Sequence, residues 1–196
     1  MYGNDEIATR SKENVKDNAE VFTPFKIVDK MLNLLPNSAW ADPQCGYIEP
    51  TCGNGQFLVK IFEKRIANGI DIITALNTMV GMDISQENIL DSHKRLYERV
   101  CAEMRVQGIT PYKKKWFDMA IQAVAIIRNN IFKVKDSLHY IEHKLENKKF
   151  FNFDPTGHNQ VLTIKQQETK ISKIKSEFRK TKENHLDNTL APFFGA

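Results

Sequence analysis

Short apolar runs alternate along this chain with longer segments in which apolar residues recur every three or four positions. The short runs are typical of buried strands, and they end at Glu49, Asp83 and Asp136. The longer segments predict amphipathic helices. In one of them Phe57, Leu58, Ile61, Phe62 and Ile66 would face inward. In another, capped by Ser85, one face would contain Ile89, His93, Leu96 and Val100. The expected strands span residues 46–49, 79–83 and 130–136, and the expected helices span residues 56–67, 70–78, 86–105 and 112–130. This alternation predicts an α/β, Rossmann-like fold with a mostly parallel sheet and right-handed crossovers.

A further helix is expected ahead of the first strand. Thr23 would cap its N-terminus and Pro24 would occupy its first position. The helix would end at Pro36. Its apolar stripe would contain Ile27, Val28, Met31, Leu32, Leu34 and Leu35. Residues 1–20 carry no periodic apolar face, so we expect them to form a flexible N-terminal arm.

Beyond residue 148 the pattern predicts a hairpin followed by a charged helix. Residues 149–164 read as two strands joined at Pro155–Gly157. Residues 165–188 read as a surface helix with only a thin apolar seam. The chain is therefore divided into an arm (1–20), an α/β domain (21–164) and a basic C-terminal helix and tail (165–196).

The composition is typical of a globular cytoplasmic protein. Hydrophobic residues make up 41% of the chain, which suffices for a core, and no apolar run is long enough to cross a membrane. The N-terminus does not resemble a secretory signal, and three cysteines do not suggest a disulfide framework. We expect no membrane contact and no metal site, because His139 and His143 would lie on a solvated helix.

Basic residues concentrate between residues 112–150 and 165–182, although the net charge is only +4. Such clusters are compatible with the phosphate backbone of a nucleic acid as partner. Acidic residues interrupt the second cluster at Glu168, Glu177 and Glu183, so a solvated helix face is the alternative interpretation.

The turn after the first expected strand is the clearest candidate site. The spacing of Gly53 and Gly55 permits a tight turn and a close approach to a ligand. Glu49 precedes this turn, and its carboxylate would repel phosphate but suits the ammonium and sulfonium groups of S-adenosylmethionine. Asp83 ends the second strand, where an acidic residue can bind both ribose hydroxyls, and Ile84 can pack on adenine. A helix cap is the alternative role for Asp83.

These segments resemble the motifs of N6-adenine DNA methyltransferases of restriction-modification systems. Residues 49–58, Glu-Pro-Thr-Cys-Gly-Asn-Gly-Gln-Phe-Leu, are similar to the first motif of that family, and Gly81–Ile84 is similar to its ribose motif. Val21–Pro24 resembles the segment that folds over the methionine end of the cofactor. Phe132–Leu138 resembles the third motif, whose Asp lies near the cofactor adenine. The order of the motifs is that of enzymes whose cofactor half comes first.

The resemblance implies a set of residues that bind S-adenosylmethionine. They are Phe22, Thr23, Pro24, Glu49, Pro50, Cys52, Gly53, Gly55, Phe57, Asp83, Ile84, Asp136 and Ser137. Cys52 is expected to be a small buried thiol rather than a nucleophile.

The chain departs from this family in the catalytic half. The family binds the flipped adenine with an Asn/Asp-Pro-Pro-aromatic motif, and no such tetrapeptide occurs here. Asp154 and Pro155 are the nearest match, with Phe151 or Phe153 as a stacking surface. A simple hairpin turn is the alternative, because Asp-Pro-Thr-Gly is a strong turn sequence. The second half of the fold is therefore expected to be missing, reworked or supplied by a second chain.

Three functions are compatible with this pattern. The first is an S-adenosylmethionine-dependent methyltransferase acting on nucleic acid, with DNA adenine N6 as the target that the resemblance implies. The second is a degenerate, non-methylating subunit or regulator of a methylation or restriction system. The third is a different S-adenosylmethionine-consuming enzyme.

Overall fold

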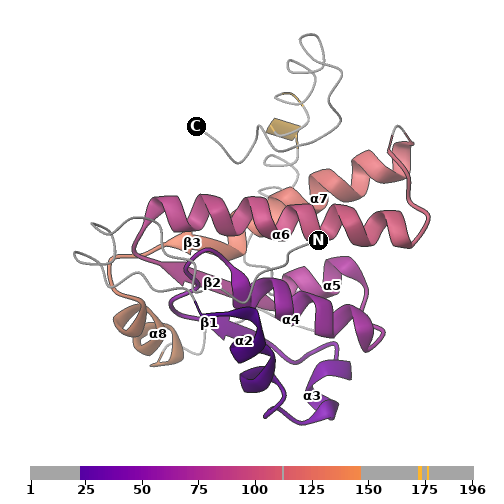
Figure 1. Ribbon diagram of the computed structural model, residues 1–196. Coiled ribbons are helices and arrows are strands. Elements are labelled where there is room, and N and C mark those ends of the chain that lie inside the picture. Colours follow the sequence, from indigo (N-terminus) through magenta and orange to yellow (C-terminus); the bar gives the residue numbers. More distant parts are fainter. Residues whose placement is uncertain (1–22, 112, 147–171, 174–175, 177–196) are drawn as a thin grey trace.

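A computed structural model describes residues 23–111, 113–146, 172–173 and 176 of the chain (Figure 1). The elements in this part are α2 (Phe25–Leu32), α3 (Asn37–Ala41), β1 (Tyr47–Glu49), α4 (Gln56–Ala67), α5 (Ile72–Asn77), β2 (Met79–Asp83), α6 (Gln86–Val106), α7 (Lys114–Asn130), β3 (Ile131–Lys133) and α8 (Ser137–Glu146).

The three described strands form one parallel sheet in the order β1-β2-β3. Glu49 pairs with Gly81, and Asp83 pairs with Lys133. Helices lie between successive strands along the chain. Helix α6 runs across β2 and β3 and also packs against α4 and α7 (Figure 1). The predicted α/β, Rossmann-like architecture is confirmed. Because the strands are parallel, their carboxyl ends lie at one edge of the sheet, where such folds bind ligands.

The helical periodicity locates the buried faces of α4 and α6 correctly. In α4 the side chains of Leu58 and Phe62 are fully buried. In α6 the expected face is also buried, namely Ile89, His93, Leu96 and Val100. Ser85 caps α6 as expected, because its Oγ accepts a hydrogen bond from the Asn88 amide at 3.3 Å. None of the described helices is long and apolar enough to cross a membrane.

The prediction for α2 is wrong at both ends. Pro24 occupies the cap position with an extended backbone, and its carbonyl accepts hydrogen bonds from the Ile27 and Val28 amides, so Thr23 is not the N-cap. The helix ends at Leu32 rather than before Pro36. Only two of the six expected stripe positions, Val28 and Leu32, are buried, while Ile27, Met31, Leu34 and Leu35 are exposed. Six apolar positions in nine residues cover more than one helix face.

Two further segments differ from the expectation. Pro36 starts the short helix α3, which buries Trp40, instead of only ending the helix before it. Strand β3 covers three residues rather than residues 130–136, because Asn130 still belongs to α7 and Asp136 already caps α8. The predicted arm and hairpin lie outside the described residues. So does most of the predicted C-terminal helix, of which residues 172–173 and 176 are helical.

A buried cation joins the segment before β1 to the core. Arg65, near the end of α4, has no exposed surface. Its guanidinium donates hydrogen bonds to the carbonyl oxygens of Trp40 (3.2 Å) and Asp42 and to the Thr78 hydroxyl (3.2 Å), and it also lies over the Tyr47 ring. These bonds involve none of the described carboxylates. Carbonyl oxygens therefore replace the water that a buried charge loses.

We expect Arg65→Met to destabilise the protein by about 3 kcal/mol, because buried carbonyl and hydroxyl groups lose their donors. Urea denaturation at neutral pH measures this change. Lys64→Met is the control: the Lys64 ammonium bonds to the exposed Asn33 side chain and lies 5.3 Å from the centre of the Trp40 ring, and its loss should cost less than about 1 kcal/mol. Equal losses in the two variants would contradict the role assigned to Arg65.

Candidate cofactor site

Asp83, the last residue of β2, fixes the glycine turn that follows β1. One carboxylate oxygen, Oδ2, accepts a hydrogen bond from the Gly53 amide at 2.9 Å. The Gly53 carbonyl in turn accepts a hydrogen bond from the Ser92 hydroxyl of α6 at 2.7 Å. The Cys52 amide donates to the Met82 carbonyl at 2.8 Å, which continues the pairing of the two strands beyond β1. The turn is therefore held by both β2 and α6.

The same carboxylate also organises the start of α6. Its second oxygen, Oδ1, accepts hydrogen bonds from the Ser85 amide at 2.8 Å and the Asn88 side chain at 3.2 Å. Asp83 therefore stabilises the start of α6 with one carboxylate oxygen and the glycine turn with the other. A carboxylate offers about four acceptor positions. Three donors leave capacity for one further hydrogen bond on this buried side chain.

The second glycine of the turn is required by its conformation and by its neighbour. Gly55 has a φ of 86°, a left-handed conformation that residues with a side chain adopt only at a cost. A Cβ at this position would lie 2.9 Å from the Ser92 Cα. Gly81 of β2 has no left-handed φ and is constrained only by its neighbour, since a Cβ there would lie 2.7 Å from the Leu58 Cδ1, the end of a buried side chain. Both glycines let α4 and α6 approach the strands closely.

Glu49 carries a partly buried negative charge beside this turn. The Thr51 amide donates to its Oε1 at 3.4 Å, and none of the described Lys, Arg or His side chains forms an ion pair with it. Burial raises the pKa of the Glu49 carboxyl above its usual value of 4.5. A buried carboxylate without a cationic partner is complementary to a positively charged ligand.

Cys52 is buried, as expected, and it lies near both carboxylates. Burial raises the pKa of its thiol to about 12, with further contributions from the charges of Asp83 and Glu49. Such a pKa favours the protonated thiol at neutral pH and disfavours a thiolate nucleophile.

The remaining expected residues differ in their relation to this site. Thr23, Pro24 and Pro50 are half-buried, and Phe57 packs against the core from the first turn of α4. Ile84 directly follows Asp83 and is 58% exposed, so its side chain is accessible to a flat ligand. Asp136 and Ser137 follow β3, and Asp136 accepts a hydrogen bond from the His139 amide at 2.9 Å. Phe22, Asp154 and Pro155 lie outside the described residues, as do Phe151 and Phe153.

Three residues of the site were not expected from the sequence. Ser92 and Asn88 hold the turn and Asp83, as described above. Gln56, the first residue of α4, is buried, and its side-chain oxygen Oε1 has no hydrogen-bond partner among the described residues. A buried acceptor without a donor is costly, so Gln56 is suited to accept a hydrogen bond from a ligand.

No protein-family model, curated protein or solved structure matches this chain.

Gly55→Ala should destabilise the protein by about 3 kcal/mol, because left-handed strain adds to a clash with the backbone of α6. Gly69→Ala is a matched control. Gly69 has nearly the same φ, 85°, but nothing lies within 4 Å of the position of its Cβ. The Gly69→Ala substitution should lower the free energy of unfolding only by the left-handed strain, about 1–2 kcal/mol. Thermal or urea unfolding of both variants measures the difference, and equal losses would refute the close contact with Ser92.

Glu49→Gln should stabilise the ligand-free protein at neutral pH. A raised pKa means that the folded state binds a proton more tightly than the unfolded state, so this group's contribution is present at low pH and is lost as pH rises through the folded pKa. The stability difference in favour of the variant should therefore grow between about pH 4 and pH 7. Urea denaturation over this range measures it, with Glu142→Gln as the control for the exchange itself at an exposed position. A less stable Glu49→Gln variant at neutral pH would contradict the analysis.

Proposed function

We propose that this chain binds S-adenosylmethionine at the turn between β1 and α4 and transfers its methyl group to a nucleic acid. The observation that carries the proposal is the glycine turn bonded to Asp83, with the Glu49 carboxylate, which has no cationic partner among the described residues, four positions before Gly53. The resemblance of residues 20–138 to N6-adenine DNA methyltransferases supports adenine N6 of DNA as the target.

The charges of the site match this cofactor better than a dinucleotide. A pyrophosphate at the start of α4 would face the negative charge of Glu49, which no described cationic side chain neutralises, whereas Asp83 suits the ribose of either ligand. S-adenosylmethionine carries an ammonium and a sulfonium group instead. Glu49 and the unpartnered Oε1 of Gln56 can receive the ammonium, while the remaining acceptor capacity of Asp83 can receive a ribose hydroxyl. Ile84 can then pack on the adenine.

The target base needs its own acceptors. When the adenine amino nitrogen attacks the cofactor's methyl carbon, the carbon–sulfur bond breaks and the amino group loses a proton. Acceptors beside that nitrogen hold it in line and favour its positive charge in the transition state. Asp154 and the Pro155 carbonyl offer such a pair within this sequence, and a second chain is the other possible source.

A second candidate function rests on one observation. The family's Asn/Asp-Pro-Pro-aromatic tetrapeptide occurs nowhere in the sequence. A cofactor-binding subunit or regulator that does not methylate would retain the turn, Glu49 and Asp83 without that motif. Binding and transfer assays separate the two functions, because both require cofactor binding but only the first produces methylated nucleic acid.

Calorimetric titration should show that S-adenosylmethionine binds and that NAD does not. Asp83→Ala should weaken binding roughly tenfold or more, because a hydrogen bond to a charged group contributes about 1.5–3 kcal/mol. Ser92→Ala is the control for loosening of the turn, since it removes the bond to Gly53 but keeps both carboxylates. Equal weakening by the two variants would show that Asp83 acts only through the turn. Wild-type protein without binding at about millimolar cofactor would refute the proposal.

Asp154→Ala tests the source of the catalytic acceptor. If Asp154 binds the target amino group, the variant should lose methyl transfer to DNA or RNA while its affinity for S-adenosylmethionine stays unchanged. Incorporation of labelled methyl groups and calorimetry measure the two quantities. Undiminished transfer would make Asp154 a turn residue. Wild-type protein that binds cofactor but methylates neither DNA nor RNA would favour the non-methylating subunit.

A further inference from the structure

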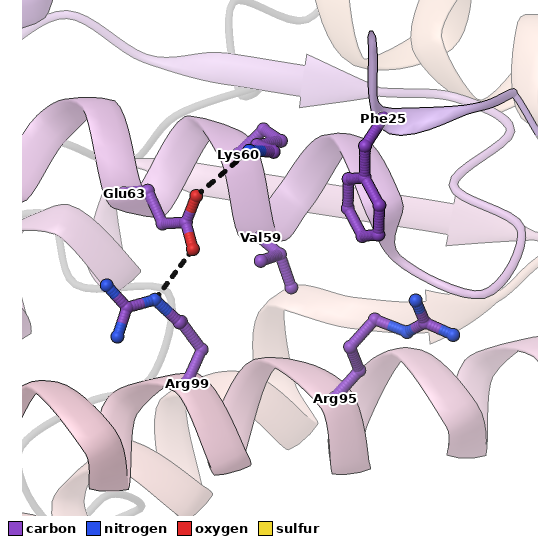
Figure 2. A pocket seen from close by; sticks show the side chains of 6 residues that line it. All are labelled: Phe25, Val59, Lys60, Glu63, Arg95 and Arg99. Atoms are coloured by element: carbon purple, nitrogen blue, oxygen red, sulfur yellow. Dashed lines mark hydrogen bonds and ion pairs between the residues drawn. The ribbon is translucent and has the colours of Figure 1, made fainter. Parts of the chain in front are cut away.

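A cavity of about 260 Å³ lies between α2, α4 and α6, and none of the residues that line it belongs to the set expected to bind the cofactor. Its lining consists of Phe25, Val59, Lys60, Glu63, Arg95 and Arg99 (Figure 2). The volume is close to the lower end of the range for small-molecule pockets. The side chains combine an aromatic ring and an aliphatic group on one side with guanidinium groups from α6 on the other (Figure 2).

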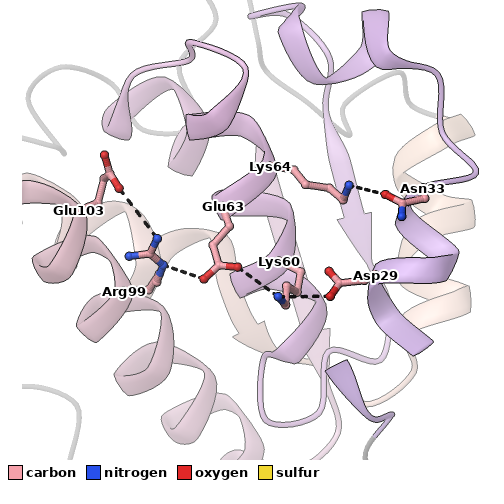
Figure 3. Close-up of polar contacts among 7 residues, drawn as sticks. All are labelled: Asp29, Asn33, Lys60, Glu63, Lys64, Arg99 and Glu103. Carbon is pink, nitrogen blue, oxygen red and sulfur yellow. Dashed lines mark hydrogen bonds and ion pairs between the residues drawn. The ribbon is translucent and has the colours of Figure 1, made fainter. Parts of the chain in front are cut away.

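Most charges around this cavity are already paired. Glu63 bonds to the Arg99 Nε at 2.7 Å and to the Lys60 ammonium at 3.4 Å (Figure 3). Lys60 also pairs with Asp29 at 3.4 Å, and Arg99 with Glu103 at 3.9 Å. This series of ion pairs alternates in sign, so its members have little capacity to attract a further charge.

Arg95 is the exception. It is half-buried, it lines the cavity, and it forms no hydrogen bond or ion pair with any described residue. The carboxylate of Glu63, the acidic group in the lining, is held by Arg99 and Lys60. The guanidinium of Arg95 is therefore available for an anion, which it can bind through two parallel hydrogen bonds.

Phe25 and Val59, on the opposite side of the cavity, favour an apolar group in the rest of the ligand. Phe25 is half-buried, and Val59 is only 6% exposed, so both present apolar surface to the cavity. The Lys60 ammonium lies 5.3 Å from the centre of the Phe25 ring, which limits access to that part of the ring by another cation. A flat apolar group between Phe25 and Val59 would displace water from this surface.

We propose that this cavity binds a small organic anion that consists of a flat apolar ring and a single carboxylate or phosphate group. The ring packs against Phe25 and Val59, and the anionic group binds the guanidinium of Arg95. The inference does not depend on the proposed cofactor, because it uses neither Glu49 nor Asp83.

Three probes separate the contributions of ring and charge. Benzoate carries both, benzamide carries the ring without the charge, and acetate carries the charge without the ring. Titration of the full chain, followed by the backbone amide signals of Val59, Lys60 and Arg95 in NMR spectra, should give saturable shifts with benzoate and much weaker binding with the other two. Phenyl phosphate then distinguishes a preference for phosphate from a preference for carboxylate.

Arg95→Gln should weaken benzoate binding about tenfold or more, because the charge-assisted pair is lost. Lys94→Gln, at an exposed position of the same helix outside the lining, should leave it unchanged. Equal binding of benzoate and benzamide, an undiminished affinity in Arg95→Gln, or no saturable shift with benzoate would each overturn the proposal. The cofactor titration of the same variant should equal that of the wild type, so failure at one site is distinguishable from failure at the other.

Discussion

The hydrogen bond from the Gly53 amide to the Asp83 carboxylate is the constraint on which the site depends. It joins the turn after β1 to the end of β2, and the second oxygen of Asp83 joins both to the start of α6. Because α6 also holds the Gly53 carbonyl through Ser92, the turn cannot move without disturbing two neighbouring elements. A ligand would therefore meet a preorganised turn, which reduces the entropy lost on binding.

Two charged side chains of opposite sign, Arg65 and Glu49, differ in the hydrogen-bond partners that the chain gives them. Arg65 is fully buried, but carbonyl oxygens and the Thr78 hydroxyl surround its guanidinium. Glu49 is less deeply buried, but its carboxylate accepts only one described hydrogen bond, from the Thr51 amide at 3.4 Å, and burial raises the pKa of the carboxyl. Both terminal nitrogens of the Arg65 guanidinium are hydrogen-bonded within the chain and only its Nε has no partner, whereas the Glu49 carboxylate has no cationic partner among the described residues. This difference gives Arg65 a structural role and is the reason for proposing Glu49 as a ligand-binding residue.

Local sequence patterns predicted the elements that surround the site. Strand ends at Glu49 and Asp83, the start of α4 after Gly55 and the cap at Ser85 all follow from neighbouring residues. Contacts between distant residues could not be predicted in this way. Ser92 bonds to a residue 39 positions earlier, and as a single polar residue on a helix it carries no local signal of that contact.

The prediction for α2 was wrong for a related reason. Its apolar residues are too numerous to define one face, so packing against α4 decides that Val28 and Leu32 are buried while Met31 is exposed. The short helix α3 depends on the stacking of Trp40 on Tyr47, whose ring centres lie 5.0 Å apart. Neither contact is encoded in a periodic pattern.

The amide signal of Gly53 provides the most direct test of the central claim, because that amide joins the turn to Asp83. In NMR spectra of the isotope-labelled full chain, the signals of Gly53 and Gly55 should shift saturably as S-adenosylmethionine is added, and the same amount of NAD should leave them in place. Unchanged glycine signals at about millimolar S-adenosylmethionine would contradict the account. Shifts of equal size with NAD would show that the turn does not discriminate against phosphate.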